Sequence, residues 1–172
     1  MTDINLGTYS SDDLIVILTV QETTHSVSGF AEGTMLSVEK STPSSTLVLN
    51  GDAGGGRVFR KTSDGMITLT LNQWSATNDV LSWIHKRDGE TRDNTWLFNL
   101  VIKDGTGRSA HFARQCFIEN LPNSSFGTEL ETREWVIRSA DMEHFVGGNS
   151  KLPADIIATI ESIGGTVEDR WR

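Results

Sequence analysis

The segment from residue 66 to residue 72 shows the strictest alternation of apolar and polar side chains in this chain. Ile67, Leu69 and Leu71 stand at every second position, and threonine or asparagine follows each of them. Successive side chains of a β-strand point to opposite faces, so this pattern predicts a strand with one buried and one solvated face. A shift of the pairing by one residue would expose all three apolar side chains, which means that the register of this strand is strongly specified.

Other short apolar runs predict further strands, and turn residues separate them. The chain has 172 residues with 16 glycines and only 3 prolines, which favours a β-rich fold with many turns. Its length is typical of one domain with a sizeable core. The further predicted strands are 13–21, 34–40, 46–49, 96–103, 108–119 and 129–139.

Two amphipathic helices are expected between and after these strands. The first runs from residue 76 to about residue 86, with Ser75 as its N-cap and Asp79 in its first turn. The residues of this helix that should pack on the sheets are Val80, Leu81 and Ile84. The second helix follows Pro153 and has an apolar face made of Ile156, Ile157, Ile160 and Ile163.

Composition divides the chain into three parts. Residues 1–12 are polar and are interpreted as an N-terminal arm. Residues 13–146 hold all the predicted strands and the first helix, and they are interpreted as one mainly β domain. Residues 147–172 begin with a glycine-rich linker and end in the second, short amphipathic helix.

The charge balance argues against a protein that grips nucleic acid. The chain has 23 acidic and 15 basic side chains, a formal net charge of −8. Such a surface repels phosphate, although it can stand beside nucleic acid without binding it. The apolar runs are shorter than the roughly 18 residues of a membrane-spanning helix, and the N-terminus lacks the features of a signal peptide. We therefore expect no membrane segment.

Residues that could support catalysis or bind a metal are scattered along the chain. The lone Cys116 lies in an apolar run and is interpreted as a small buried side chain instead of a reactive thiol. No catalytic fingerprint is present, so we expect neither an enzyme nor a cofactor. The histidines, none of which has the spacing of a zinc site, are His25, His85, His111 and His144.

Residues 50–61 form the most flexible segment by composition. Glycines at 51, 54, 55 and 56 precede a cluster of basic residues. The segment lacks the Gly-Lys-Ser/Thr ending of a phosphate-binding loop, and no ordinary helix follows it. Because glycine loses much backbone entropy when it is fixed and buries no side chain, we expect a loop that its own contacts cannot keep ordered.

Several segments, taken together, resemble the tail-tube proteins of contractile-tailed bacteriophages. The resemblance covers roughly residues 13–146 and is most specific from 63 to 85, whereas residues 147–172 match no pattern of that family. The segments are Gly29-Phe-Ala-Glu-Gly-Thr, the glycine-rich stretch from Asn50, residues 63–73, Trp74-Ser-Ala-Thr-Asn-Asp-Val-Leu-Ser, Asp104-Gly-Thr-Gly and Thr132-Arg-Glu-Trp-Val-Ile.

The resemblance implies a fold and a function. Proteins of this family, like the haemolysin-coregulated protein of type VI secretion, have two packed antiparallel sheets that form a barrel, with one helix against it. Six copies close into a ring, and rings stack into a hollow tube that conducts the genome. A contractile sheath surrounds the tube, the tape-measure protein and then double-stranded DNA pass through it, and baseplate and terminator proteins stand at its ends. The implied location is the virion tail, assembled in the cytoplasm of the host bacterium.

In such a tube, the glycine-rich segment is a candidate contact between rings or between subunits. We expect its ordering to be coupled to assembly, with its charged residues paired across the joint. The residues concerned are Asp52, Gly54, Gly55, Gly56, Arg57, Arg60 and Lys61.

Other functions remain open at this point. A tail terminator or a baseplate ring protein would share the fold, and so would an effector-carrying ring of a type VI secretion system. A monomeric carbohydrate-binding β-sandwich is a further alternative, with Trp74, Trp83 and Trp96 as its platform.

Overall fold

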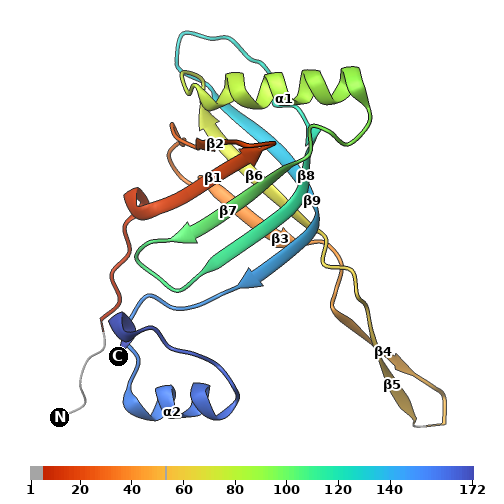
Figure 1. Ribbon diagram of the computed structural model, residues 1–172, viewed down its shortest axis with the longest axis vertical. Helices are drawn as coiled ribbons and strands as arrows, with labels where there is room; N and C mark the ends of the chain where they lie inside the picture. The colour runs from red at the N-terminus through yellow and green to blue at the C-terminus, as the bar shows by residue number, and fades with distance from the viewer. Residues whose placement is uncertain (1–5, 53) are drawn as a thin grey trace.

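The computed structural model of the chain describes residues 6–52 and 54–172. The described residues are mainly β, as the sequence predicted, and form nine strands and two α-helices (Figure 1). The helices are α1 (Thr77–Thr91) and α2 (Ala154–Ser162), with short 3-10 helices η1 (Ser11–Asp13) and η2 (Asp169–Trp171). The strands are β1 (Leu14–Val20), β2 (Thr23–Ser26), β3 (Leu36–Lys40), β4 (Ser45–Leu49), β5 (Gly55–Phe59), β6 (Gly65–Asn72), β7 (Phe98–Asp104), β8 (Ala110–Asn120) and β9 (Thr132–Phe145).

Seven of the strands form one antiparallel sheet in the order β2-β1-β7-β8-β9-β6-β3. Figure 1 shows this sheet strongly curved, with α1 lying across one end of it. The core fills the inside of the curve and contains large buried side chains such as Trp135 and Phe98. Trp135 is also tied to the helix, since its indole N–H donates to Asn78 Oδ1 at 2.9 Å.

The sequence predicted two packed sheets that close into a barrel, and the structure has instead one curved, open sheet with a separate hairpin. The seven strands are hydrogen-bonded into a single sheet, and in the part of the chain that the structure describes its edge strands β2 and β3 do not pair with each other. The reason lies in β8, whose register shifts once against β7 and once against β9, with Gln115 in the left-handed region at φ 51°. Bulges bend a strand and increase its twist, so one sheet can curl around the core without dividing into two layers.

Strand β6 confirms the alternation from which its register was predicted. Ile67, Leu69 and Leu71 are buried, and the residues between them are half-buried. Leu69 pairs across the sheet with Trp135 of β9, and Ile67 pairs with Ile137. The apolar face of this strand is therefore fully used within a single chain.

Helix α1 begins one residue later than predicted and extends past the predicted end to Thr91, where Arg92 adopts the left-handed conformation that terminates it. The predicted N-cap is therefore off by one residue, since Ala76 holds that position and Ser75 stands two residues before the helix. The Ser75 hydroxyl still accepts a hydrogen bond from the Thr77 N–H at 3.2 Å. The same hydroxyl donates to the Ser28 carbonyl at 2.5 Å. The face toward the sheet includes buried Leu81 and Ile84, and the half-buried Val80 packs against the same core.

Strands β4 and β5 form a separate antiparallel hairpin that projects away from the curved sheet (Figure 1). The predicted loop over residues 50–61 is therefore wrong for Gly55–Phe59, which is a strand. Five residue pairs join it to β4, and Val58 and Phe59 are good strand formers, which offsets the conformational cost of its two glycines.

The C-terminal segment lies outside the core. Every residue of α2 is exposed or half-buried. The segment is tied to the turn between β7 and β8 through Arg108, whose guanidinium donates to the Ser150 carbonyl at 2.6 Å and stacks on the Trp171 ring at 4.7 Å.

Candidate assembly surfaces

The projecting hairpin, β4 and β5 with the turn between them, has apolar side chains on both of its faces. Its register pairs Ser45 with Phe59 and Leu47 with Arg57. Paired residues and alternate positions share a face. One face therefore carries Leu47, Leu49 and Phe59, which are 69%, 72% and 67% exposed. The other face carries Val48 and Val58, each half exposed.

The seven residues predicted from the sequence as an assembly contact all lie on or beside this hairpin. Asp52 and Gly54 lie in its turn, and Gly55, Gly56 and Arg57 belong to β5. Arg60 and Lys61 follow the end of β5. The sequence prediction missed the apolar side chains that flank these residues. The available signal was the β4 run Leu47-Val48-Leu49, which is apolar at consecutive positions where a half-buried strand would alternate.

Three local contacts help to shape the hairpin. The guanidinium of Arg57 lies 4.2 Å from the centre of the Phe59 ring and also donates to Ser45 Oγ at 3.2 Å. At the base of the hairpin, the Arg60 N–H donates to the Ser44 carbonyl at 2.9 Å. The two ends of the hairpin are therefore adjacent where they leave the sheet.

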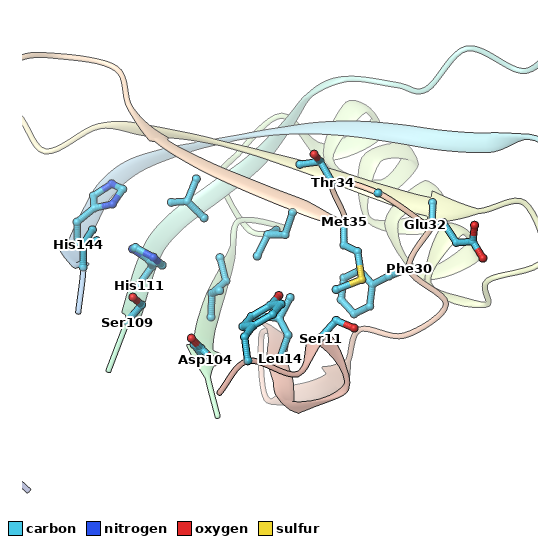
Figure 2. Close-up of a pocket in the computed structure, with 17 residues that line it drawn as sticks. Ser11, Leu14, Phe30, Glu32, Thr34, Met35, Asp104, Ser109, His111 and His144 are labelled. Carbon is cyan, nitrogen blue, oxygen red and sulfur yellow. The ribbon is translucent and has the colours of Figure 1, made fainter. Parts of the chain in front are cut away.

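A groove of about 730 Å³ opens on the concave side of the sheet, between β3 and the ends of β7, β8 and β9. Its apolar lining includes Leu36 and Val38 of β3, Ile102 of β7, and Phe30. Figure 2 shows His111 and His144 at one end of the groove, with Phe30, Met35 and Glu32 toward the other. The groove exists because the sheet curls without closing on this side.

His111 and His144 are paired directly across β8 and β9, with ring centres 5.0 Å apart in an edge-to-face arrangement. Within the described part of the chain, Nδ1 of His111 and Nε2 of His144 are buried and have no hydrogen-bond partner. Burial, and then the charge of His144, lowers the pKa of His111. Burial, and then the charge of Lys40, lowers the pKa of His144. Their proximity depends on strand register, which is why the sequence did not reveal it.

The three tryptophans considered as a sugar platform are only partly brought together. Trp83 and Trp96 line a shallow apolar groove beside α1 with Val80 and Ile84. Trp74 is exposed and does not belong to that lining. The arrangement therefore does not assemble the predicted three-residue platform.

Among the residues that the structure describes, no three His, Cys, Asp or Glu side chains are grouped so that they could hold a metal ion. Cys116 is buried, as predicted, and burial raises the pKa of its thiol to about 11. No helix within residues 6–52 and 54–172 is long and apolar enough to cross a membrane.

Comparison with known proteins identifies relatives of this chain. No protein-family model matches it. The structural protein ORF10 of Pseudomonas phage KPP10 is 30% identical over 167 residues, and the alignment covers 96% of each chain. An alignment of that extent reaches into residues 147–172, so at least part of the C-terminal segment is shared with this relative.

Solved structures share the fold at much lower identity. A chain in the baseplate of the anti-feeding prophage has a TM-score of 0.56 and 11% identity, covering 84% of this chain and 97% of that one. A chain in the extended sheath-tube complex of the extracellular contractile injection system PVC has a TM-score of 0.54 and 12% identity, covering 80% and 93%. The predicted resemblance to tail-tube proteins is thereby confirmed. This chain belongs to the family of the bacteriophage structural protein ORF10, and it shares its fold with chains in the baseplate and in the sheath-tube complex of contractile injection systems.

Proposed function

We propose that this chain is the tail-tube subunit of a bacteriophage, and that homohexameric rings of it stack into a hollow tube. The tube conducts the viral genome into the host when the contractile tail ejects it. The tail sheath surrounds the tube, the tape-measure protein and then DNA pass through the lumen, and baseplate and terminator proteins close the ends. The subunit acts within the virion tail, after assembly in the bacterial cytoplasm.

The observation that carries this proposal is the hairpin with two exposed apolar faces. An isolated two-stranded hairpin is at best marginally stable in water, and contiguous exposed apolar surface marks an interaction site. Leu47, Leu49 and Phe59 on one face, with Val48 and Val58 on the other, need cover from outside their own chain. A subunit of a stacked assembly meets neighbours on several sides, which would bury both faces.

The charge of the chain suits a conduit. Six copies of −8 carry a formal charge of −48 per ring, which opposes tight binding of phosphate along the lumen. We expect dissociation constants for duplex DNA above the micromolar range near physiological salt. Submicromolar binding in a fluorescence titration would contradict a passive conduit.

A baseplate ring protein is the second candidate, because one of the similar chains comes from a baseplate. The fold alone supports a tail terminator equally well. Electron micrographs distinguish them, since a tube subunit gives long filaments and a baseplate or terminator protein gives single rings. An effector-carrying ring of a secretion system would also give single rings.

The proposal is tested by removing the hairpin from a chain that otherwise stays intact. Because Ser44 and Arg60 are joined by a backbone hydrogen bond, residues 45–59 can be replaced by two glycines without separating the ends. The full chain should scatter light as about six times 18.9 kDa, or as longer tubes, whereas the shortened chain should be a folded monomer.

Two single substitutions serve as controls, Thr46→Ser in β4 and Thr24→Ser in β2. Both threonines are exposed, and neither change removes an apolar side chain from the hairpin. Both serine variants should assemble like the original chain. A full chain that stays monomeric at high micromolar concentration would contradict the proposed function.

A further inference from the structure

The groove between β3 and the ends of β7, β8 and β9 is uncovered in the single chain, and residues of the chain's own hairpin do not line it within the described ranges. We propose that it is the receptor for the β4–β5 hairpin of a second copy. This inference rests on the proposed function and names the partner surface for the hairpin. It identifies two complementary surfaces on one chain.

The apolar chemistry of the two surfaces matches. The hairpin presents three large apolar side chains on its Leu47 face. The groove offers an apolar lining from Leu36, Val38 and Ile102, and its volume of about 730 Å³ is within the range of pockets that enclose a drug-sized ligand. Several hairpin side chains therefore fit into it, although not the whole hairpin.

The charges of the two surfaces are also complementary. On the Leu47 face of the hairpin the one charged residue is Arg57, and the one acid of the hairpin, Asp52, lies in its turn. Arg60 and Lys61 follow β5 at the base of the hairpin, so that residues 45–61 together have a formal charge of +2 in a chain whose total is −8. Among the 17 described residues that line the groove, Glu32 and Asp104 are acidic and none is lysine or arginine. With neutral histidines this lining has a formal charge of −2. Arg57 on the inserted face, with Arg60 and Lys61 behind it, is attracted by this lining, which contains no lysine or arginine to repel it.

The two surfaces are different parts of the chain, so the contact is heterologous. When the hairpin of one copy fills the groove of the next, the first copy keeps an empty groove and the second keeps a free hairpin. Such head-to-tail contacts propagate, and they end only when a ring closes or a filament stops growing. The placement of hairpin and groove thus accounts for assembly beyond a dimer.

Site-specific cross-linking tests the contact. Two single-cysteine substitutions are made in separate chains: Leu49→Cys on the hairpin, and Thr34→Cys on the exposed rim of the groove. One of the two chains is labelled with ¹⁵N, so that a disulfide between unlike chains is recognised by its mass. Cys116 can stay, because it is buried and its pKa of about 11 keeps it a thiol. The control pair combines Leu49→Cys with Glu22→Cys, because Glu22 is exposed in the β1–β2 turn, away from the groove. After oxidation of the assembled mixtures, the yield of mixed dimers from the Leu49→Cys and Thr34→Cys pair should be at least about ten-fold higher than the yield from the control pair.

Opposite charges at one rim position give an independent readout. Thr34→Arg should raise the concentration needed for assembly by about ten-fold or more, because the added guanidinium repels Arg57 and the basic residues that follow β5. Thr34→Glu introduces a long side chain of the opposite charge and should assemble normally or better. If the unaltered chain assembles, but Thr34→Cys cross-links no better than Glu22→Cys or Thr34→Arg assembles like Thr34→Glu, the groove is not the receptor. If the unaltered chain does not assemble at all, the proposed function fails first.

Discussion

Strand β6 and the β4–β5 hairpin both contain strongly β-forming residues, but they use their apolar side chains differently. In β6, polar residues alternate with apolar ones, and Ile67, Leu69 and Leu71 are buried by the same chain. In the hairpin, apolar residues occupy both faces, and Leu47 and Leu49 stay about 70% exposed. A strand with one apolar face is satisfied within a monomer, whereas a hairpin with two apolar faces requires a partner.

The largest loss of stability is expected when an acid replaces a buried residue of β6. Leu69→Asp puts an unpaired carboxylate among Trp135 and the core, and it should lower the free energy of unfolding by on the order of 4 kcal/mol or abolish folding. Denaturant titration of the dissociated chain measures it. If Leu69→Asp left the free energy of unfolding unchanged, Leu69 would not be buried in the core.

A smaller loss is expected at the start of α1. Ser75→Ala removes a buried hydroxyl that donates to the Ser28 carbonyl and accepts from the Thr77 N–H, so the variant should lose about 1–2 kcal/mol in the same titration. Ser162→Ala, at the exposed end of α2, is the comparison and should cost less than about 0.5 kcal/mol. Equal losses from the two variants would show that Ser75 does not hold the start of α1 to the segment after β2.

Between pH 7.5 and 5, the pH dependence of stability should be modest and should come from the histidine pair. Both pKa values lie below the ordinary 6.5, so the unfolded chain takes up protons before the folded one does. The stabilisation is complete above pH 6.5 and is lost as the pH falls through the lowered values. His111→Gln should flatten the decrease in melting temperature between pH 7.5 and 5. A slope unaffected by His111→Gln would contradict this assignment.

The smallest effect on folding, and the sharpest test of the contrast with β6, is expected for Leu49→Asp on the hairpin. Because Leu49 is 72% exposed, its replacement should change the stability of the monomer by less than about 0.5 kcal/mol. The same change should nevertheless prevent assembly, since it puts a charge on a face that must be desolvated. Light scattering and denaturant titration on one sample separate the two effects.

Much of the core could be predicted from the sequence, because local periodicity carries the information. The alternation in residues 66–72 defined β6, and the spacing of Val80, Leu81 and Ile84 marked the face that α1 turns to the sheet. Two short strands were missed. β2 has four polar residues without alternation, and β5 begins with two glycines.

Features that depend on distant pairing could not be predicted. The curl of one sheet in place of a closed barrel follows from bulges in β8, which leave no periodic mark in the sequence. The groove is a consequence of that curl, and its histidine pair forms only because β8 and β9 bring positions 111 and 144 opposite each other. Composition indicated the charged and glycine residues of the hairpin, and the run Leu47-Val48-Leu49 carried a signal for apolar side chains on both faces of β4. Strand register was needed to show that Phe59 and Val58 of β5 join those two faces.

Hydrogen–deuterium exchange of assembled and dissociated protein tests the central claim most directly, namely that the hairpin is completed by another copy. In the dissociated chain, amides of β4 and β5 should exchange quickly while those of β6 stay protected. After assembly, β4 and β5 should become protected to a degree that approaches β6, with no comparable change in α2. Equal exchange of the hairpin in both samples, at matched concentration and pH, would show that assembly does not cover it and would contradict the account.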